Sequence, residues 1–346
     1  MESRLDIRQL SLQDIQQYVV TWKEPAFRAK QIYEWLWKKS CYSFDEMTNL
    51  SLPLREKLKD NFLIQSLVLD TAQYSSDGTI KSRFILHDSS KIEAVLIPVK
   101  EENRFTVCVS TQVGCSLTCS FCATGQMKRV RNLEASEIYD QYVYVNQQCL
   151  ENFGHPLTNV VYMGMGEPLL TYSNTMKSIE LLTSDMGLGI SPKRITISTA
   201  GIAKMIEKLA DDNPKVRLAL SLHAADDVKR NTIMPINEQN NLDVLMKALK
   251  VFYQKTGNKI SYEYIAFADF NDSIQDAKNL VSLCTSFPVT VNIIEYNPVE
   301  GVQLKKSSED NINKFAKYLR DHDVMVTVRR SRGKDIDAAC GQLANK

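Results

Sequence analysis

Residues 105–122, FTVCVSTQVGCSLTCSFC, join a strand pattern to a group of three cysteines. Apolar side chains alternate with smaller or polar ones over residues 105–110, which is the period of a half-buried strand. Cys115, Cys119 and Cys122 then fall in the segment that follows. The stretch therefore predicts a strand that delivers three thiols to one short loop.

Three kinds of site could use this cysteine spacing. Small buried cysteines could line one face of a helix, but Leu117 and Phe121 would then lie off the buried stripe. A structural zinc site needs four ligands, and the sequence has no second paired cysteine or histidine motif. An iron–sulfur cluster uses short thiolate spacings, and three ligands would leave one iron open to chelate a small molecule. The cluster is the favoured interpretation, with packing and zinc as alternatives.

Candidate strands and helices alternate along the chain from residue 105 onward. The candidate strands are 105–110, 159–164, 194–198, 216–222, 260–267, 289–295 and 324–329, and the candidate helices are 133–150, 173–184, 202–211, 241–255, 274–285 and 309–321. This alternation is typical of a parallel sheet with right-handed crossovers. The fold class predicted is α/β, a partial (β/α)6 TIM-like barrel.

The unusual motifs of the chain all follow candidate strands. They are GCSLTCSFC, GMGEP (164–168), STAG (198–201), SLHA (221–224), YNPVEG (296–301) and RRSRGKDIDAACGQL (329–343). In parallel α/β barrels the carboxyl ends of the strands meet at one rim, which carries the active site. The motifs are therefore expected to share one site.

The chain divides into four expected parts. Helical patterns at 11–20, 25–39 and 52–62 precede a strand-rich stretch. The expected division is an N-terminal helical accessory domain at 1–70, a short β linker region at 71–104, the barrel at 105–328 and a C-terminal tail at 329–346.

Composition limits the function classes. The 346 residues carry 42 Lys and Arg against 41 Asp and Glu, so nucleic acid binding would need a local basic patch. Neither an apolar signal core nor a run of membrane-spanning length occurs, which predicts a cytoplasmic protein that does not enter the membrane. Thiols stay reduced there, so eight cysteines favour metal or redox chemistry over structural disulfides.

The motifs together resemble one enzyme family. The CxxxCxxC spacing is similar to that of radical S-adenosylmethionine (SAM) enzymes, and "MGMGEPLL", "STAGI", "SLHA", "MPIN", "YNP" and "DIDAACGQL" resemble the adenine carbon-2 RNA methyltransferase family. The resemblance implies a 4Fe-4S cluster on Cys115, Cys119 and Cys122, and two SAM molecules per turnover. It further implies 23S rRNA and tRNA substrates and an electron donor such as a flavodoxin; we expect a monomer.

The same resemblance assigns catalytic roles. Cys340 would accept a methyl group from the first SAM, and an adenosyl radical made from the second would convert it to a methylene radical that adds to the base. Glu93 would take the carbon-2 proton of the resulting adduct. Cys108 would resolve the adduct by forming a disulfide with Cys340. Simple packing of the two cysteines and a solvent-exposed Glu93 are the alternatives.

The cofactor-binding residues implied by the resemblance are Gly166, Glu167, Ser198, Ser221, Leu222, His223 and Asn297. Their chemistry is suitable, because glycine permits close backbone approach and the carboxylate, hydroxyl and amide groups can bond an ammonium, a ribose or a carboxylate. His223 could instead be a core histidine whose bonds are satisfied within the protein.

Contact with RNA would need local positive charge. The candidates are Lys128, Arg129 and Arg131 after the cysteines, Arg329, Arg330, Arg332 and Lys334 before Cys340, and Lys23, Arg28, Lys30, Lys38 and Lys39 in the N-terminal helices. A solvated charged face is the alternative for each group.

Other functions remain open. Pro168 and the basic VRRSRG segment favour the carbon-2 enzyme over its relative that methylates carbon-8 and confers antibiotic resistance. A radical activase acting on a protein, or an RNA-binding module without catalysis, would be alternatives from other classes.

Overall fold

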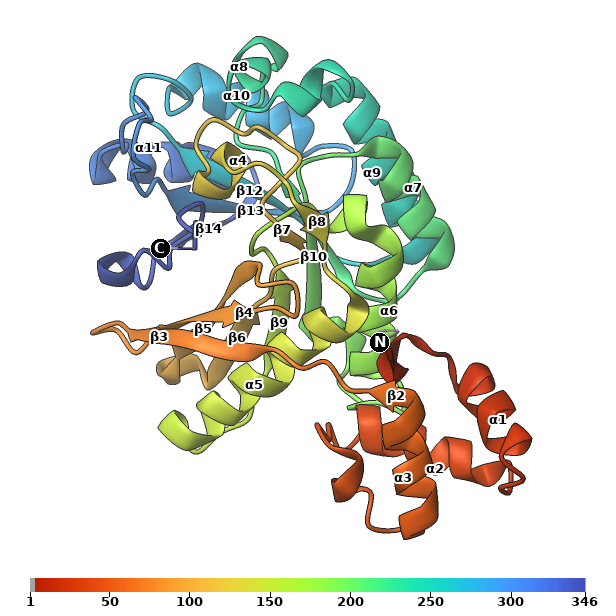
Figure 1. The fold of residues 1–346 in the computed structure, drawn as a ribbon. Coiled ribbons are helices and arrows are strands. Elements are labelled where there is room, and N and C mark those ends of the chain that lie inside the picture. Colours follow the sequence, from red (N-terminus) through yellow and green to blue (C-terminus); the bar gives the residue numbers. More distant parts are fainter. Residues whose placement is uncertain (1–3, 346) are drawn as a thin grey trace.

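One ten-stranded sheet organises the computed structural model, which describes residues 4–345. Its strand order is β14-β13-β12-β11-β10-β9-β6-β5-β4-β3. Every neighbouring pair from β6 to β14 is parallel, whereas β3, β4, β5 and β6 pair antiparallel. Because β14 ends the order and does not close onto β6, the barrel is partial (Figure 1).

The strands of this sheet are short and mostly buried. They are β3 (Val68–Tyr74), β4 (Ile80–Ile85), β5 (Lys91–Val99), β6 (Arg104–Cys108), β9 (Asn159–Tyr162), β10 (Ile195–Thr199), β11 (Arg217–Ser221), β12 (Ile260–Ala266), β13 (Val289–Glu295) and β14 (Met325–Arg329). Two small sheets pair β1 (Leu5–Asp6) with β2 (Phe62–Leu63) and β7 (Gln112–Val113) with β8 (Arg131–Asn132).

The helices fall into an N-terminal group and a group that surrounds the barrel. The first group is α1 (Leu12–Thr21), α2 (Phe27–Trp37) and α3 (Leu52–Asn61); the others are α4 (Ala123–Gln126), α5 (Ala135–Phe153), α6 (Tyr172–Thr183), α7 (Ala203–Asp212), α8 (Asp227–Ile233), α9 (Leu242–Thr256), α10 (Ile274–Leu283) and α11 (Glu309–Arg320). No helix within residues 4–345 is both long and apolar enough to cross a membrane.

The predicted α/β fold is confirmed. The candidate strands match β6 and β9 to β14, and the six candidate helices match α5, α6, α7, α9, α10 and α11. The sequence pattern missed β3, the short α8, the one-turn α4 and the two-residue strands β1, β2, β7 and β8. These elements carry too few periodic apolar positions to be recognised from the sequence.

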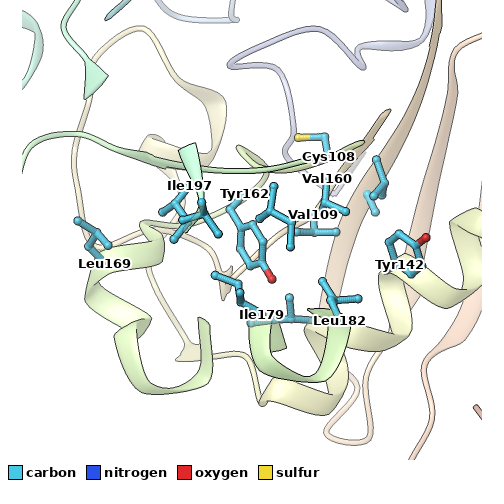
Figure 2. Close-up of a cluster of buried hydrophobic side chains, with 14 of the residues drawn as sticks. Cys108, Val109, Tyr142, Val160, Tyr162, Leu169, Ile179, Leu182 and Ile197 are labelled. Atoms are coloured by element: carbon cyan, nitrogen blue, oxygen red, sulfur yellow. The ribbon is translucent and has the colours of Figure 1, made fainter. Parts of the chain in front are cut away.

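The register of the strands decides which side chains face the barrel interior. Laterally paired residues point to the same face of a sheet. Lys81, Val95, Cys108 and Val161 form one such row across β4, β5, β6 and β9. Figure 2 shows the sulfur of Cys108 directed away from the apolar cluster around Tyr162 that packs beneath α6.

A second row crosses the other half of the sheet. Ser221, Glu263, Asn292 and Thr327 are paired across β11, β12, β13 and β14. Glu263 and Asn292 are buried, and the Asn292 amide donates to Glu263 Oε1 at 2.8 Å. Polar groups therefore line one face of the barrel strands.

A buried ion pair joins the N-terminal helices to the barrel. The Arg8 guanidinium donates from Nη1 to both carboxylate oxygens of Asp140 on α5, at 2.8 and 2.9 Å. Asp6 lies beside the same guanidinium, 3.5 Å from Nε. All three side chains are almost completely buried. Their charges are therefore stabilised by one another and not by solvation.

We expect Arg8→Ala to lower the free energy of unfolding by about 3–5 kcal/mol, because it leaves buried carboxylates without a counter-charge. Chemical denaturation measures this change. Arg104→Ala is the matched control, since Arg104 pairs with Glu102 on the exposed surface and should change stability by about 1 kcal/mol or less. Equal effects of the two variants would contradict the coupling through Asp140.

Candidate active site

The three predicted ligand cysteines lie in a loop held from two sides. The Ser120 amide donates to the Ile233 carbonyl at the end of α8, at 3.0 Å. The Ala123 amide donates to the Gly341 carbonyl of the C-terminal tail, at 2.7 Å. A side chain on Gly125 could not fit, because its Cβ would lie 2.7 Å from the Cys119 carbonyl oxygen. The loop is therefore folded tightly against the barrel and the tail.

Burial affects the three thiols strongly. Desolvation raises the pKa of Cys115 to about 11 and also raises the pKa values of Cys119 and Cys122. The Gly125 and Thr124 amides act in the opposite direction on Cys122, since they favour its thiolate. The metal-free thiols therefore hold protons at neutral pH, and metal binding would release them.

The donor set fits a cubane cluster. Within residues 4–345, no three acidic, histidine or cysteine side chains converge on a point that one metal ion could occupy. In a cubane each thiolate binds a different iron, so the three sulfur atoms need not share one ion. The Leu117 amide already donates to Cys115 Sγ at 3.4 Å, a contact that supports bound thiolates in such sites.

The GMGEP segment makes a close backbone approach beside this loop. Gly166 has φ +99°, and a Cβ there would lie 2.5 Å from Gln112 Cβ. Gln112 Oε1 accepts from the Glu167 amide at 3.0 Å. Both Glu167 oxygens accept backbone amides, from Leu169 at 3.1 Å and from Ala200 at 2.8 Å. Burial raises the pKa of Glu167 to about 7, although the hydrogen bonds from these two amides act to lower it.

One buried arginine connects the other motif loops. Arg230 donates to the carbonyls of Leu222 at 3.0 Å, Ala200 at 2.6 Å and Ser221 at 3.1 Å. It also donates to Asn237 Oδ1 at 2.5 Å. The STAG, SLHA and MPIN segments therefore share a single guanidinium, which is fully buried.

The remaining predicted cofactor residues lie near these loops with bonds of their own. Ser198 donates to the Tyr162 carbonyl at 2.7 Å. Asn297 is buried and donates to Ser331 Oγ at 3.0 Å. His223 Nδ1 accepts the Ile265 amide at 3.1 Å, and desolvation with Arg230 nearby lowers its pKa to about 3. The neutral His223 ring meets Phe121 of the cysteine loop edge-on, with ring centroids 4.8 Å apart.

The C-terminal tail brings Cys340 to the cysteine loop. Besides the Gly341 contact, the Leu343 carbonyl accepts from Thr124 Oγ1 at 2.6 Å. Cys340 is exposed, yet desolvation by the protein atoms around its sulfur, together with Cys122 and Glu263, raises the pKa of its thiol to about 12. Cys340 therefore lies close enough to Cys122 and Glu263 for their charges to affect its pKa.

Cys108 faces the same space from the sheet. Burial, with a smaller contribution from the neighbouring Cys340 thiol, raises the pKa of the Cys108 thiol to about 12. All eight cysteines are free in the structure, so the predicted disulfide between these two is not formed. The structure thus brings the two thiols into one neighbourhood in their reduced state.

The predicted base lies in the same region. Glu93 is fully buried on β5, two residues before Val95 in the Cys108 row, and therefore on the same face. Its Oε2 accepts the Ala344 amide of the tail at 3.0 Å. Lys81 Nζ lies 3.6 Å from Oε1. The alternative of a solvent-exposed Glu93 is therefore wrong.

Several basic residues predicted to meet RNA are already in ion pairs. Arg131 makes a bidentate pair with Glu137, at 2.7 and 2.8 Å, and also pairs with Asp88 at 2.6 Å. Arg330 and Lys334 both contact Glu295 at 2.7 Å. Lys128 and Arg129 are exposed beside the cysteine loop and remain the better candidates there.

Three site residues escaped the sequence analysis: Lys81, Gln112 and Arg230. Each is a polar side chain whose role depends on partners distant in the sequence. The nearby signals were the SLHA and MPIN segments on either side of Arg230 and the cysteine stretch that contains Gln112. A buried arginine in a short helix cannot be distinguished from a solvated one without its partners.

Two family models match the chain. The model described as ribosomal RNA large subunit methyltransferase N-terminal domain matches residues 5–64. The radical SAM superfamily model matches residues 109–281, which include the three loop cysteines and the GMGEP, STAG and SLHA segments.

Named relatives and a solved structure cover the chain almost completely. A probable dual-specificity RNA methyltransferase RlmN from Cytophaga hutchinsonii is 55% identical, covering 98% of this chain and 93% of its own. The dual-specificity RNA methyltransferase RlmN of Campylobacter concisus is 41% identical, covering 100% and 92%. The crystal structure of a radical SAM methyltransferase from Sphaerobacter thermophilus is 37% identical, with a TM-score of 0.92 over 99% of this chain and 100% of that one.

We expect the stability of the metal-free protein to depend on pH through Glu167. Its folded pKa of about 7 exceeds the ordinary 4.5, so its contribution is complete below about pH 4.5 and is lost as the pH rises through about 7. Because one pKa unit is worth about 1.4 kcal/mol, the loss is about 3 kcal/mol. Denaturation across this range compares the wild type with Glu167→Gln, which should lack this slope. Parallel pH profiles would contradict the assignment.

Proposed function

The chain belongs to the RlmN family of dual-specificity RNA methyltransferases, which are radical SAM enzymes, and from this membership we propose that it methylates carbon-2 of adenosine in 23S rRNA and in tRNA. The observation that carries the proposal is the docking of Cys340 beside Cys122, with Cys108 and Glu93 on the neighbouring sheet. A radical methyl transfer through a protein thiol needs those groups together.

The three loop cysteines would hold the cluster through their thiolates. With an open iron, the bound 4Fe-4S cluster would supply the one-electron chemistry that SAM cleavage and the later oxidation of the base require. Gly166 and Glu167 would receive the methionine amino group, and Ser198, Ser221, Leu222, His223 and Asn297 would bind the rest of SAM. Arg230 supports this assignment, because it holds the loops that carry four of these residues.

Cys340 would act twice in each turnover. As a thiolate it would attack the methyl carbon of a first SAM molecule, so that a carbon–sulfur bond to Cys340 forms, the methyl–sulfonium bond of SAM breaks and S-adenosylhomocysteine leaves. After loss of one hydrogen atom to the adenosyl radical of a second SAM, the methylene carbon on Cys340 would bond to carbon-2 of the adenine. The tail would then be covalently joined to the RNA.

Glu93 and Cys108 would release the product. Glu93 would accept the proton from carbon-2 as the ring regains its aromaticity. The Cys108 thiolate would attack Cys340 Sγ, so that a sulfur–sulfur bond forms and the carbon–sulfur bond breaks. The electron pair of the broken bond would stay on the methylene carbon, which would take up a proton and become the methyl group.

The parts of the chain would divide this work. We propose that residues 1–70 form the RNA-binding accessory domain, 71–104 the β linker region, 105–328 the radical SAM barrel and 329–346 the catalytic tail. The hydrogen bonds of the tail to the cysteine loop and to Glu93 support its separate role. The reductant is proposed to be a flavodoxin-like electron donor, and the working form a monomer.

Nucleoside analysis tests the function. We expect anaerobically reconstituted enzyme, given SAM and a reductant, to form 2-methyladenosine in unmodified 23S rRNA fragments and in tRNA, as read by mass spectrometry. Cys108→Ala should instead stall with RNA attached to Cys340. Formation of 8-methyladenosine would overturn the carbon-2 assignment, and methylation of neither carbon would overturn the proposal.

A further inference from the structure

Lys81 is a buried lysine to which the proposed mechanism gives no role. It lies on β4 with only 3% of its side chain exposed. Lysine is rarely buried to this extent without a partner or a function. Its Nζ lies 3.6 Å from Glu93 Oε1 and 3.4 Å from the Asp337 carbonyl oxygen, to which it donates.

The sheet register places this ammonium among the reacting groups. Lys81 is the direct lateral neighbour of Val95, which is the neighbour of Cys108. Glu93 lies two residues from Val95 and shares its face. Lys81, Glu93 and Cys108 thus occupy one surface of three adjacent strands.

The two oxygens of Glu93 have different surroundings. Oε2 accepts the Ala344 amide. Among residues 4–345, Oε1 has no hydrogen-bond partner, and Lys81 lies beside it at ion-pair distance. Oε1 is therefore the oxygen that no hydrogen-bond donor occupies, and Lys81 supplies positive charge beside it.

A base in a dry site needs such a charge. Burial favours the neutral acid over the carboxylate, and a nearby cation favours the carboxylate. A carboxylic acid that already holds its proton cannot accept another from the substrate.

We propose that Lys81 is a positioning residue for the proton-transfer step, in which its ammonium pairs with Glu93 Oε1 and holds that oxygen toward the reacting base. This inference rests on the proposed function, in which Glu93 accepts the carbon-2 proton. The bond from Lys81 to the Asp337 carbonyl links this charge to the docked tail that carries Cys340. The tail has further bonds that do not involve Lys81, from Thr124 to the Leu343 carbonyl and from the Gly333 amide to Asp77, so it should stay docked in a Lys81 variant.

The test measures each half of the reaction in the reconstituted full-length enzyme. In Lys81→Met, we expect S-methylation of Cys340, read by peptide mass spectrometry, at the wild-type level. The covalent protein–RNA adduct, read on denaturing gels after rapid quenching, should decay about tenfold more slowly or worse, because loss of the ion pair lets Oε1 move, and a misplacement of about 1 Å can cost that much or more. Glu93→Gln should cause the same accumulation.

Three further variants separate positioning from structural support. Lys91→Met removes an exposed lysine of β5 that pairs with Asp70, and adduct decay should not change. Lys81→Arg retains the charge and should restore much of the decay rate. The double variant Lys81→Met with Glu93→Gln contains no unpaired buried charge, so it should fold, and it should accumulate no more adduct than Glu93→Gln alone.

Clear outcomes would overturn the proposal. They are decay of the Lys81→Met adduct at the wild-type rate, equal loss of Cys340 methylation and adduct resolution in that variant, or a further tenfold slowing when Lys81→Met is added to Glu93→Gln. Failure of the proposed function would be distinguishable, because Cys108→Ala would then trap no adduct whatever residue occupies position 81.

Discussion

The alternation of side chains along paired strands is the constraint on which the site depends. Because lateral neighbours share a face, the pairing that places Val161 beside Cys108 also places Val95 and Lys81 in the same row. Slipping one strand by a residue would turn Cys108 into the apolar layer beneath α6, where Tyr162 packs (Figure 2). That layer therefore fixes the orientation of the Cys108 thiol on the opposite face.

The antiparallel strands β3, β4 and β5 support the C-terminal tail. They extend the sheet beyond β6 and form the surface on which the tail rests. Gly333 donates to Asp77 at 2.8 Å and Arg83 donates to the Asn345 carbonyl at 3.0 Å, so the tail is bonded near both of its ends. With the cysteine loop on its other side, the tail is held between the proposed cluster and the proposed base.

Local patterns predicted much of this arrangement. The cysteine spacing, the alternating strands and the motif positions depend on neighbours within a few residues, and they gave the barrel and its rim. The roles of Arg230 and Lys81 depend on partners brought together only by folding. Arg131 shows the same limit, because its basic character suggested RNA contact whereas Glu137 and Asp88 neutralise it.

Disulfide trapping tests most directly whether the tail thiol and the strand thiol meet. Cluster-loaded protein would be treated anaerobically with a mild thiol oxidant, and its cysteine peptides mapped by mass spectrometry. The account predicts a bond between Cys108 and Cys340, while Cys41, Cys149 and Cys284 stay free. A Cys340 that remains free or pairs elsewhere, with Cys108 unmodified, would contradict it.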